Sequence, residues 1–329
     1  MRRHSGFLPA FVLTVALGLP SPAAAQSFDF TETLPAGAVT TLDVRTTRGK
    51  IVVTADAAAG VVVTGTATVR LGWNVAANAE ELARGVAAHP PIRQDGQTLR
   101  LEPPADDVDR SVTVAYQVHV PASTIVTTSS QSGETKIERV GGAVTVRTQS
   151  SAILLISLGG PATVNSGSGD VAAVAVGGDL SITTSSSAIT ASGLGGNLHV
   201  ETGSGRVEAS FSGAGDADVH SSSSAITLRR LAGGVTVTSN SGQVTLEGTP
   251  ARDWKVTTQS SAIEARLPGL AAATLDLSTR SGRVKVEGAD VSGTVDKGRA
   301  SGQVHGGGPT LGFSSRSGSI QVTFGGTEG

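Results

Sequence analysis

Apolar and polar residues alternate with a period of two along most of this chain, and the alternating stretches restart at nearly constant spacing. The stretches align on one serine each: Ser132, Ser150, Ser168, Ser186, Ser204, Ser223, Ser241, Ser260, Ser281, Ser301 and Ser317. Successive serines are 16 to 21 residues apart, most often 18. The sequence therefore predicts an all-β fold, a parallel β-helix or β-solenoid of about 18–20 residues per coil.

The aligned columns predict how each coil is built. Apolar residues recur four positions before the serine and again three positions after it, and Ser or Thr recurs two positions before it. Such period-two alternation is typical of a strand with one buried face. The residue after the serine is Gly in some coils, such as Gly205, and Ser followed by Ala in others, such as Ser187-Ala188. A glycine there indicates a corner that needs a positive φ or a close backbone approach, and the alternation suggests a repeating unit of two coils.

The N-terminal part of the chain departs from this rhythm. Residues 42–53 fit the frame as a first coil, with Arg48 in the serine position. Between residues 55 and 120 we expect strands at 61–69, 99–102 and 111–120, a helix at 78–88 with Asn78 as its N-cap, and an acidic loop at Asp106, Asp107 and Asp109. We predict that residues 26–123 form the first coil and a capping insertion, and that residues 124–329 form the repeat domain, because a bare terminal coil would expose unpaired strand edges.

One coil near the C-terminal end fits the frame poorly. Lys297 and Gly298 occupy strand positions, Arg299 replaces the usual Ser or Thr, and three glycines follow at 306–308. We expect an irregular edge there, because glycine weakens a strand interior.

Residues 1–25 have the pattern of a cleaved signal peptide, with Arg2 and Arg3, an apolar run from Phe7 to Leu19, and small residues at 23–25. We therefore predict an extracytoplasmic protein, whether periplasmic, cell-surface or secreted. Cleavage would shift the formal net charge from −2 to −4, because two arginines leave with no acid. This acidity argues against a nucleic-acid partner. No later apolar segment is long enough for a transmembrane helix, and the absence of cysteine excludes disulfides and thiolate metal sites.

Several motifs together resemble a known family. They are the segment 47–53 (TRGKIVV), the segment 116–121 (YQVHVP) that leads into the repeats, and the serial Ser-Gly-x-Val/Ile motifs. On these motifs the chain resembles the bacterial β-strand-repeat family described as adhesins, a domain of unknown function. The resemblance covers roughly residues 40–324. It implies a solenoid and a role in adhesion, and it brings no catalytic residues.

Two groups of side chains are candidates for chemistry. We interpret the serine column as structural, because hydroxyl groups near a corner bond one another and the nearby backbone. On the outward face, the frame places His199 beside Asp218 and Glu201 beside His220 on adjacent coils. These are the residue types of a divalent metal site or an acid–base pair. Because no third histidine or shielding loop is evident, we interpret them as a surface patch of ion pairs and assign no catalytic, cofactor or metal residue.

The sequence thus predicts a non-enzymatic extracytoplasmic solenoid, an adhesin or a structural or interaction protein of the cell envelope. The alternative is a β-helix protein that binds or cleaves polysaccharide. Cleavage would need clustered acids in a groove walled by long loops, whereas the loops here are short and rich in glycine. The expected partner is a cell-surface protein or a polysaccharide, and no cofactor is expected.

Overall fold

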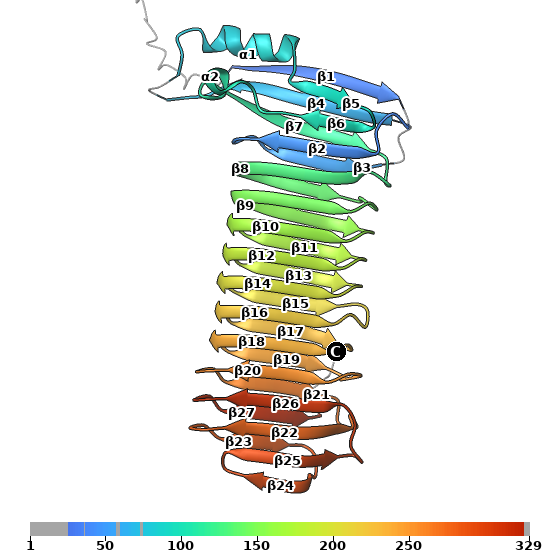
Figure 1. Cartoon of the computed structure of the whole chain (residues 1–329), viewed down its shortest axis with the longest axis vertical. Coiled ribbons are helices and arrows are strands. Elements are labelled where there is room, and N and C mark those ends of the chain that lie inside the picture. The colour runs from blue at the N-terminus through green and yellow to red at the C-terminus, as the bar shows by residue number, and fades with distance from the viewer. Residues whose placement is uncertain (1–25, 36, 57–59, 73–74, 326–329) are drawn as a thin grey trace, which may run out of the picture.

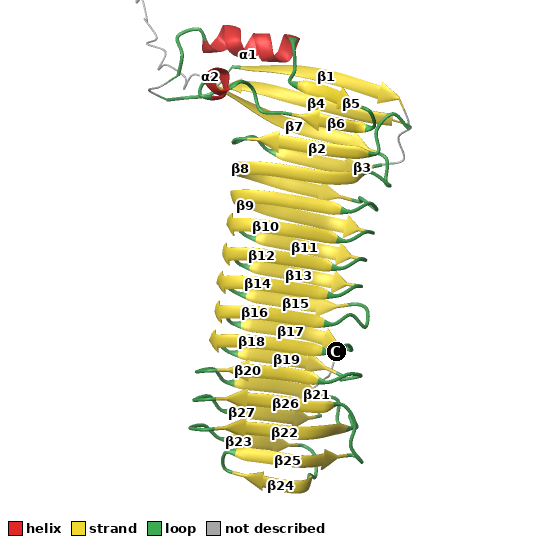
Figure 2. Cartoon of the chain, viewed as in Figure 1, coloured by secondary structure: helices red, strands yellow, loops and turns green. Residues whose placement is uncertain are grey.

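The computed structural model describes residues 26–35, 37–56, 60–72 and 75–325, and the signal-peptide prediction lies outside them. Hydrogen bonds join the 27 strands of the described residues into one sheet. This sheet winds into a tall stack with strands along its whole length and helices at one end only (Figures 1 and 2). The all-β solenoid predicted from the sequence is confirmed.

The stack consists of two ladders that face each other. Ladder A contains, from the N-terminal end of the stack, β5 (Ile92–Asp95), β6 (Thr98–Leu101), β2 (Thr41–Thr46), the first parts of β8 (Ile125–Glu138) and β9 (Val144–Leu158), β10 (Ala162–Ser168), β12 (Leu180–Ser186), β14 (Leu198–Ser204), β16 (Ala217–Ser223), β18 (Val235–Ser241), β20 (Trp254–Thr258), β26 (Thr310–Ser315), β22 (Ala273–Thr279), β25 (Arg299–Val304) and β24 (Ser292–Asp296).

Ladder B contains, in the same direction, β1 (Ser27–Pro35), β4 (Gly60–Val69), β7 (Val112–Val120), β3 (Ile51–Ala55), the second parts of β8 and β9, β11 (Val171–Val176), β13 (Ile189–Leu194), β15 (Val207–Phe211), β17 (Ile226–Leu231), β19 (Val244–Gly248), β21 (Ile263–Leu267), β27 (Ile320–Phe324) and β23 (Val284–Glu287). The pairing from β3 to β23 is parallel throughout.

The core is a thin double layer between the ladders. Like residues stack on like, for example Ile182 on Val200 and Ile189 on Val207, and each of these is at most 1% exposed. The largest buried side chain, Trp254, donates its indole N–H to the carbonyl oxygen of Gly233 over 3.0 Å. Because neighbouring coils share both hydrogen bonds and apolar columns, a coil is stable only within the stack.

The corner between the ladders alternates between two designs. In three of the four coils where Ser follows the aligned serine, its buried hydroxyl bonds the hydroxyl two residues before that serine, as in Thr184–Ser187 at 2.6 Å. In the coils that contain Gly169, Gly205 and Gly242, the hydroxyl donates instead to the aligned serine's own carbonyl, as from Thr202 to Ser204 over 2.9 Å. The predicted two-coil unit therefore has a hydrogen-bonding basis.

The two corner designs also fit together sterically. Gly205 has a φ of +117°, and a Cβ placed on it would lie 2.0 Å from the carbonyl oxygen of Ser187 in the preceding coil. Gly169 and Gly242 meet the carbonyls of Ser151 and Ser224 in the same way. Gly282 and Gly318 lack a positive φ but approach neighbouring carbonyls equally closely. Both reasons given for glycine at the corner are confirmed.

The coils are not stacked in chain order at either end. At the C-terminal end, β26 and β27, the last strands in sequence, lie between β20–β21 and β22–β23. At the N-terminal end, β2 and β3 likewise lie between β6–β7 and β8. The constant spacing of the repeats did not predict this order of the coils. The chain reaches past the last coil and turns back to fill a place inside the stack.

Antiparallel strands lie at both ends of the stack. At the C-terminal end β25 and β24 form a hairpin, so Ser301 belongs to no parallel coil, and the expected irregular edge is confirmed. At the N-terminal end β1 pairs with β4 and β4 with β7, while helix α1 (Ala79–Ala88) packs on these strands. Asn78 sits at the N-cap but makes no side-chain capping bond. The acidic loop is instead a helical turn, α2 (Asp106–Asp109), whose Asp109 pairs with Arg48 at 3.4 Å.

The single tyrosine of the chain lies in this N-terminal region. Tyr116 is 2% exposed, and its hydroxyl donates to the carbonyl oxygen of Glu102 over 2.9 Å. Burial, and secondarily the charge of Glu102, raise the pKa of Tyr116 well above its ordinary value. Within the described residues, no helix is long and apolar enough to cross a membrane.

Candidate binding face

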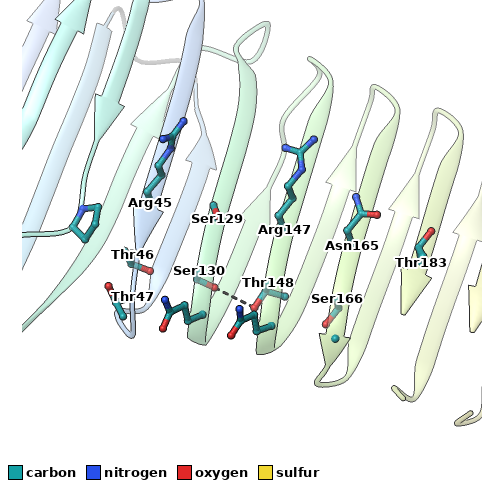
Figure 3. Close-up of a pocket in the computed structure, with 14 residues that line it drawn as sticks. Arg45, Thr46, Thr47, Ser129, Ser130, Arg147, Thr148, Asn165, Ser166 and Thr183 are labelled. Carbon is teal, nitrogen blue, oxygen red and sulfur yellow. Dashed lines mark hydrogen bonds between the residues drawn. The ribbon is translucent and has the colours of Figure 1, made fainter. Parts of the chain in front are cut away.

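The outward side of ladder A presents three side chains per strand in straight columns. The residues of these columns lie five, three and one positions before the aligned serine of each coil, and the columns run the length of the stack. We call this surface the grooved face. Its middle column holds Arg45, Ser129, Arg147, Asn165 and Thr183, which come from five successive strands and lie in a row in Figure 3. Period-two alternation builds this face, because the intervening residues point into the core.

Four hollows lie along the grooved face. One of about 540 Å³ runs from Arg45 to Thr183, and one of about 430 Å³ continues from Thr183 to Asn240. One of about 360 Å³ lies over β20, β26 and β22, and one of about 340 Å³ lies at Arg280 and Arg316. The first two share Thr183 and the last two share Ser278, so the hollows adjoin in pairs. Together they suit an extended partner better than a compact small molecule.

The two outward faces differ in how their charges are arranged. On ladder B most cations pair with an acid on the same or a neighbouring strand. The pairs are Lys136–Glu138, Arg206–Glu208, Arg229–Glu247, Arg266–Glu264 and Lys285–Glu287. On the grooved face, Arg45 pairs with Asp43 at 2.7 Å, and the hydrogen bond and charge of Asp43 raise the pKa of Arg45.

Four other cations of the grooved face have no such partner. Arg147, Lys255, Arg280 and Arg316 are exposed, and none forms an ion pair with a carboxylate of the described residues. Ladder B thus pairs most of its charges internally, whereas the grooved face leaves four cations, and the acids Glu201 and Asp218 that contact only histidines, available for an external group.

The predicted patch of His199, Glu201, Asp218 and His220 lies in the middle of the grooved face. The register places His199 opposite Asp218 and Glu201 opposite His220, as expected. His199 Nδ1 lies 3.1 Å from Asp218 Oδ2, and His220 Nε2 lies 3.0 Å from Asp218 Oδ1. The second contact is short, but it does not have hydrogen-bonding geometry.

These four side chains are 40% to 56% exposed. Within the part of the chain that the structure describes, no group of three or more His, Asp or Glu residues is arranged to hold a metal ion. Exposed pairs of this kind contribute about 0–1 kcal/mol each. Their geometry is that of a surface ion-pair network centred on Asp218.

The aligned serines form a ladder of their own beside the grooved face. Their hydroxyls pair between a Ser-type coil and the Gly-type coil that follows: Ser150–Ser168 at 3.2 Å, Ser186–Ser204 at 3.1 Å and Ser223–Ser241 at 3.1 Å. Among the described residues, His119 bonds a carboxylate and an amide, His199 bonds a carboxylate and His305 bonds a backbone carbonyl, and no histidine bonds a serine or threonine hydroxyl. These bonds support the structural interpretation of the serine column.

Sequence reasoning missed the pairing of Arg280 with Arg316. The two are 36 residues apart and come together only because β26 lies between β20 and β22. With the coils stacked in chain order, Arg280 would instead neighbour Gln259. The visible signal was the arginine that both coils carry immediately before the aligned serine.

The described residues thus form a parallel β-solenoid with one grooved, polar face. The chain belongs to the Toastrack family: the family model described as Toastrack DUF4097 matches residues 110–323. This confirms the family resemblance seen in the sequence, and the family's function is not assigned. No curated protein matches the chain.

Solved structures of low identity also match. A putative adhesin from Parabacteroides distasonis ATCC 8503 is 8% identical over 91% of this chain and 97% of its own, with a TM-score of 0.31. A putative cell adhesion protein from Clostridium sporogenes ATCC 15579 is 8% identical over 91% of this chain and 100% of its own, with a TM-score of 0.23. At these scores neither likeness carries an argument, and the family assignment rests on the sequence match.

Proposed function

We propose that this chain is a non-enzymatic extracytoplasmic protein of the cell envelope that adheres to an extended partner through the grooved face. The observation that carries the proposal is the contrast between the two outward faces. Ladder B pairs most of its charges internally, whereas the grooved face combines adjoining hollows with cations that have no acidic partner. Unpaired polar groups repeated along a rigid rod allow many weak contacts to act together.

The ends of the stack support a role as a rigid, separate rod. We propose that α1 and the antiparallel strands at the N-terminal end cap the solenoid, and that the β24–β25 hairpin does so at the other end. Uncapped solenoids expose strand edges that pair with other chains. A capped rod presents its side faces to a partner instead.

The absence of an activated nucleophile on the grooved face favours binding over catalysis. The serine hydroxyls there bond one another, and the carboxylates at Glu201 and Asp218 contact histidines in an open, exposed setting. A glycosidase needs one carboxyl group whose pKa is raised by burial. Of the two alternative functions, polysaccharide binding and polysaccharide cleavage, we therefore favour binding.

The experiment uses the mature chain, residues 26–329, incubated with immobilised envelope polysaccharides and with whole envelope fragments. We expect retention on at least one polymer and no release of new reducing or unsaturated ends. Turnover that survives stringent purification would contradict the non-enzymatic assignment. Fractionation of cells that make the full chain tests the location, and recovery in the cytoplasm would contradict it.

A further inference from the structure

We propose that the hollow at Arg280 and Arg316 is an anion site that binds the carboxylate or sulfate groups of an acidic polysaccharide lying along the grooved face. This inference rests on the proposed function and specifies the chemistry of the partner.

The two arginines are direct neighbours on adjacent strands. β22 pairs with β26 so that Thr279 lies opposite Ser315, which places Arg280 opposite Arg316 at the next position. The Ser281 N–H donates to the carbonyl oxygen of Arg316 over 3.1 Å, and the Arg280 N–H donates to that of Ser315 over 3.2 Å. Strands in a sheet lie about 4.8 Å apart, so two guanidinium groups share one small hollow.

The fold uses the hydroxyl groups of Thr279 and Ser315 but gives the two arginine side chains no partner among the described residues. Thr279 donates its hydroxyl to the carbonyl oxygen of Gly318 over 2.8 Å, and Ser315 donates to that of Ser261 over 3.2 Å. None of the five lining residues carries a carboxylate; they are Ser278, Thr279, Arg280, Ser315 and Arg316. Two adjacent like charges repel each other, and an external anion would relieve that repulsion. Guanidinium groups bind carboxylate and sulfate-like oxygens through paired N–H donors.

Two further cations flank the site. The carbonyl oxygen of Arg283 accepts from the Ile320 N–H of the layer above, and that of Lys297 accepts from the Val284 N–H of the same corner. Both residues are exposed and without an ion pair to the acids of the described residues. Asp296 is the acid next to Lys297 in the sequence. It forms no ion pair with Lys297, Arg283 or the two arginines of the hollow. One corner of the stack therefore concentrates positive charge in a chain of formal charge −2.

The surroundings favour an acidic polysaccharide over a lipid surface or a nucleic acid. The site opens onto the hollow over β20, β26 and β22, with which it shares Ser278, so a bound anionic group can belong to a chain that continues along the grooved face. A lipid headgroup would occupy this hollow alone, whereas a polymer would also contact the adjoining hollow. Nucleic-acid binding usually needs a basic protein with exposed aromatic side chains for stacking. Apart from the imidazoles of His199 and His220, the outward columns of the described residues carry no aromatic side chain.

The test compares dextran sulfate, polygalacturonate and neutral dextran as immobilised ligands for the mature chain. The variant is Arg280→Gln with Arg316→Gln, and the matched control is Arg229→Gln with Arg266→Gln on ladder B, which changes the net charge equally. We expect binding to the two acidic polymers that weakens with salt, at least tenfold weaker binding by the variant, and less than twofold change in the control. Unchanged thermal unfolding of both would show that these exposed substitutions leave the fold intact.

Three results would overturn the anion site. They are equal binding of the acidic polymers by the variant and the wild type, no binding of either acidic polymer by the wild type, and binding only to phosphatidylglycerol vesicles or to single-stranded DNA. Any of these results, together with retention of the wild type on a neutral polymer or an envelope fragment, would reject this site and leave the proposed function standing. Loss of all retention in the wild type would reject both.

Discussion

At the scale of single residues, the corner beside ladder A shows how sequence determines the stacking of coils. A Ser-type coil buries a hydroxyl at the corner, and the Gly-type coil after it presents no Cβ to the carbonyl of that serine. The sequence predicted both the glycine requirement and the two-coil unit. It did not predict that the second serine points inward, because Ser is compatible with either face of a strand.

Gly205→Ala is expected to destabilise the solenoid. The substitution places a Cβ 2.0 Å from the carbonyl oxygen of Ser187 and at a φ of +117°. Strain of this backbone kind costs about 1–3 kcal/mol, and separation of the two coils adds to it. Urea unfolding followed by circular dichroism gives the free energy of unfolding. The matched control is Gly85→Ala in α1, where no atom lies within 4 Å. There we expect stabilisation of about 0.5–1 kcal/mol, and equal effects at the two sites would refute the packing argument.

Tyr116 is expected to resist ionisation until the protein unfolds. Its folded pKa lies above the unfolded value of about 10, because burial disfavours the phenolate. The unfolded chain therefore loses this proton first as pH rises. The stability that the neutral phenol contributes is complete below about pH 10 and is lost progressively above it. Because the chain has one tyrosine, tyrosinate absorbance reports this group alone. We expect the absorbance to rise together with the loss of β-sheet circular dichroism. A rise near pH 10 with the sheet intact would show that Tyr116 is accessible.

At the scale of elements, the sequence predicted most strands and the one long helix but not the order of the coils at the ends. Strand formation depends on local alternation, which the repeat makes clear. The order depends on which coil fills the place beside β20–β21, and both the β22–β23 and the β26–β27 segments carry the frame. The decisive difference is the poor segment around Lys297, which forms an antiparallel hairpin and lets the last coil turn back. The order of the coils therefore depends on tertiary contacts, and it cannot be predicted from any one segment of the sequence.

Amide hydrogen exchange read by mass spectrometry tests this order. β27 (Ile320–Phe324) lies close to the chain end but pairs on both sides, with β21 and β23. β24 (Ser292–Asp296) pairs only with β25, and all five of its residues are exposed. We expect peptides from β27 to exchange much more slowly than those from β24, because protection follows the free energy of local opening. Exchange that becomes steadily faster towards the end of the sequence would contradict the inserted coil.

At the scale of the whole molecule, the structure is a rod with two unlike faces. Eleven coils of the described residues stack from β2–β3 to β22–β23. They are spaced about 4.8 Å apart, so this part of the solenoid extends about 50 Å. The sequence located the His199–Asp218 patch on the correct face. It could not reveal that this face is grooved and retains unpaired cations, because ion pairs across coils depend on side-chain geometry.

The central claim, that the chain binds through the grooved face, is tested most directly by a matched pair of substitutions in one coil. Thr183 and Thr190 are both exposed and lie in β12 and β13, on opposite outward faces, and Thr183 lines two of the hollows. Retention of the mature chain on its best-binding polymer or envelope fragment is measured for Thr183→Trp and for Thr190→Trp. We predict at least tenfold weaker retention for Thr183→Trp and less than twofold change for Thr190→Trp. Equal effects, or a larger loss with Thr190→Trp, would contradict the claim.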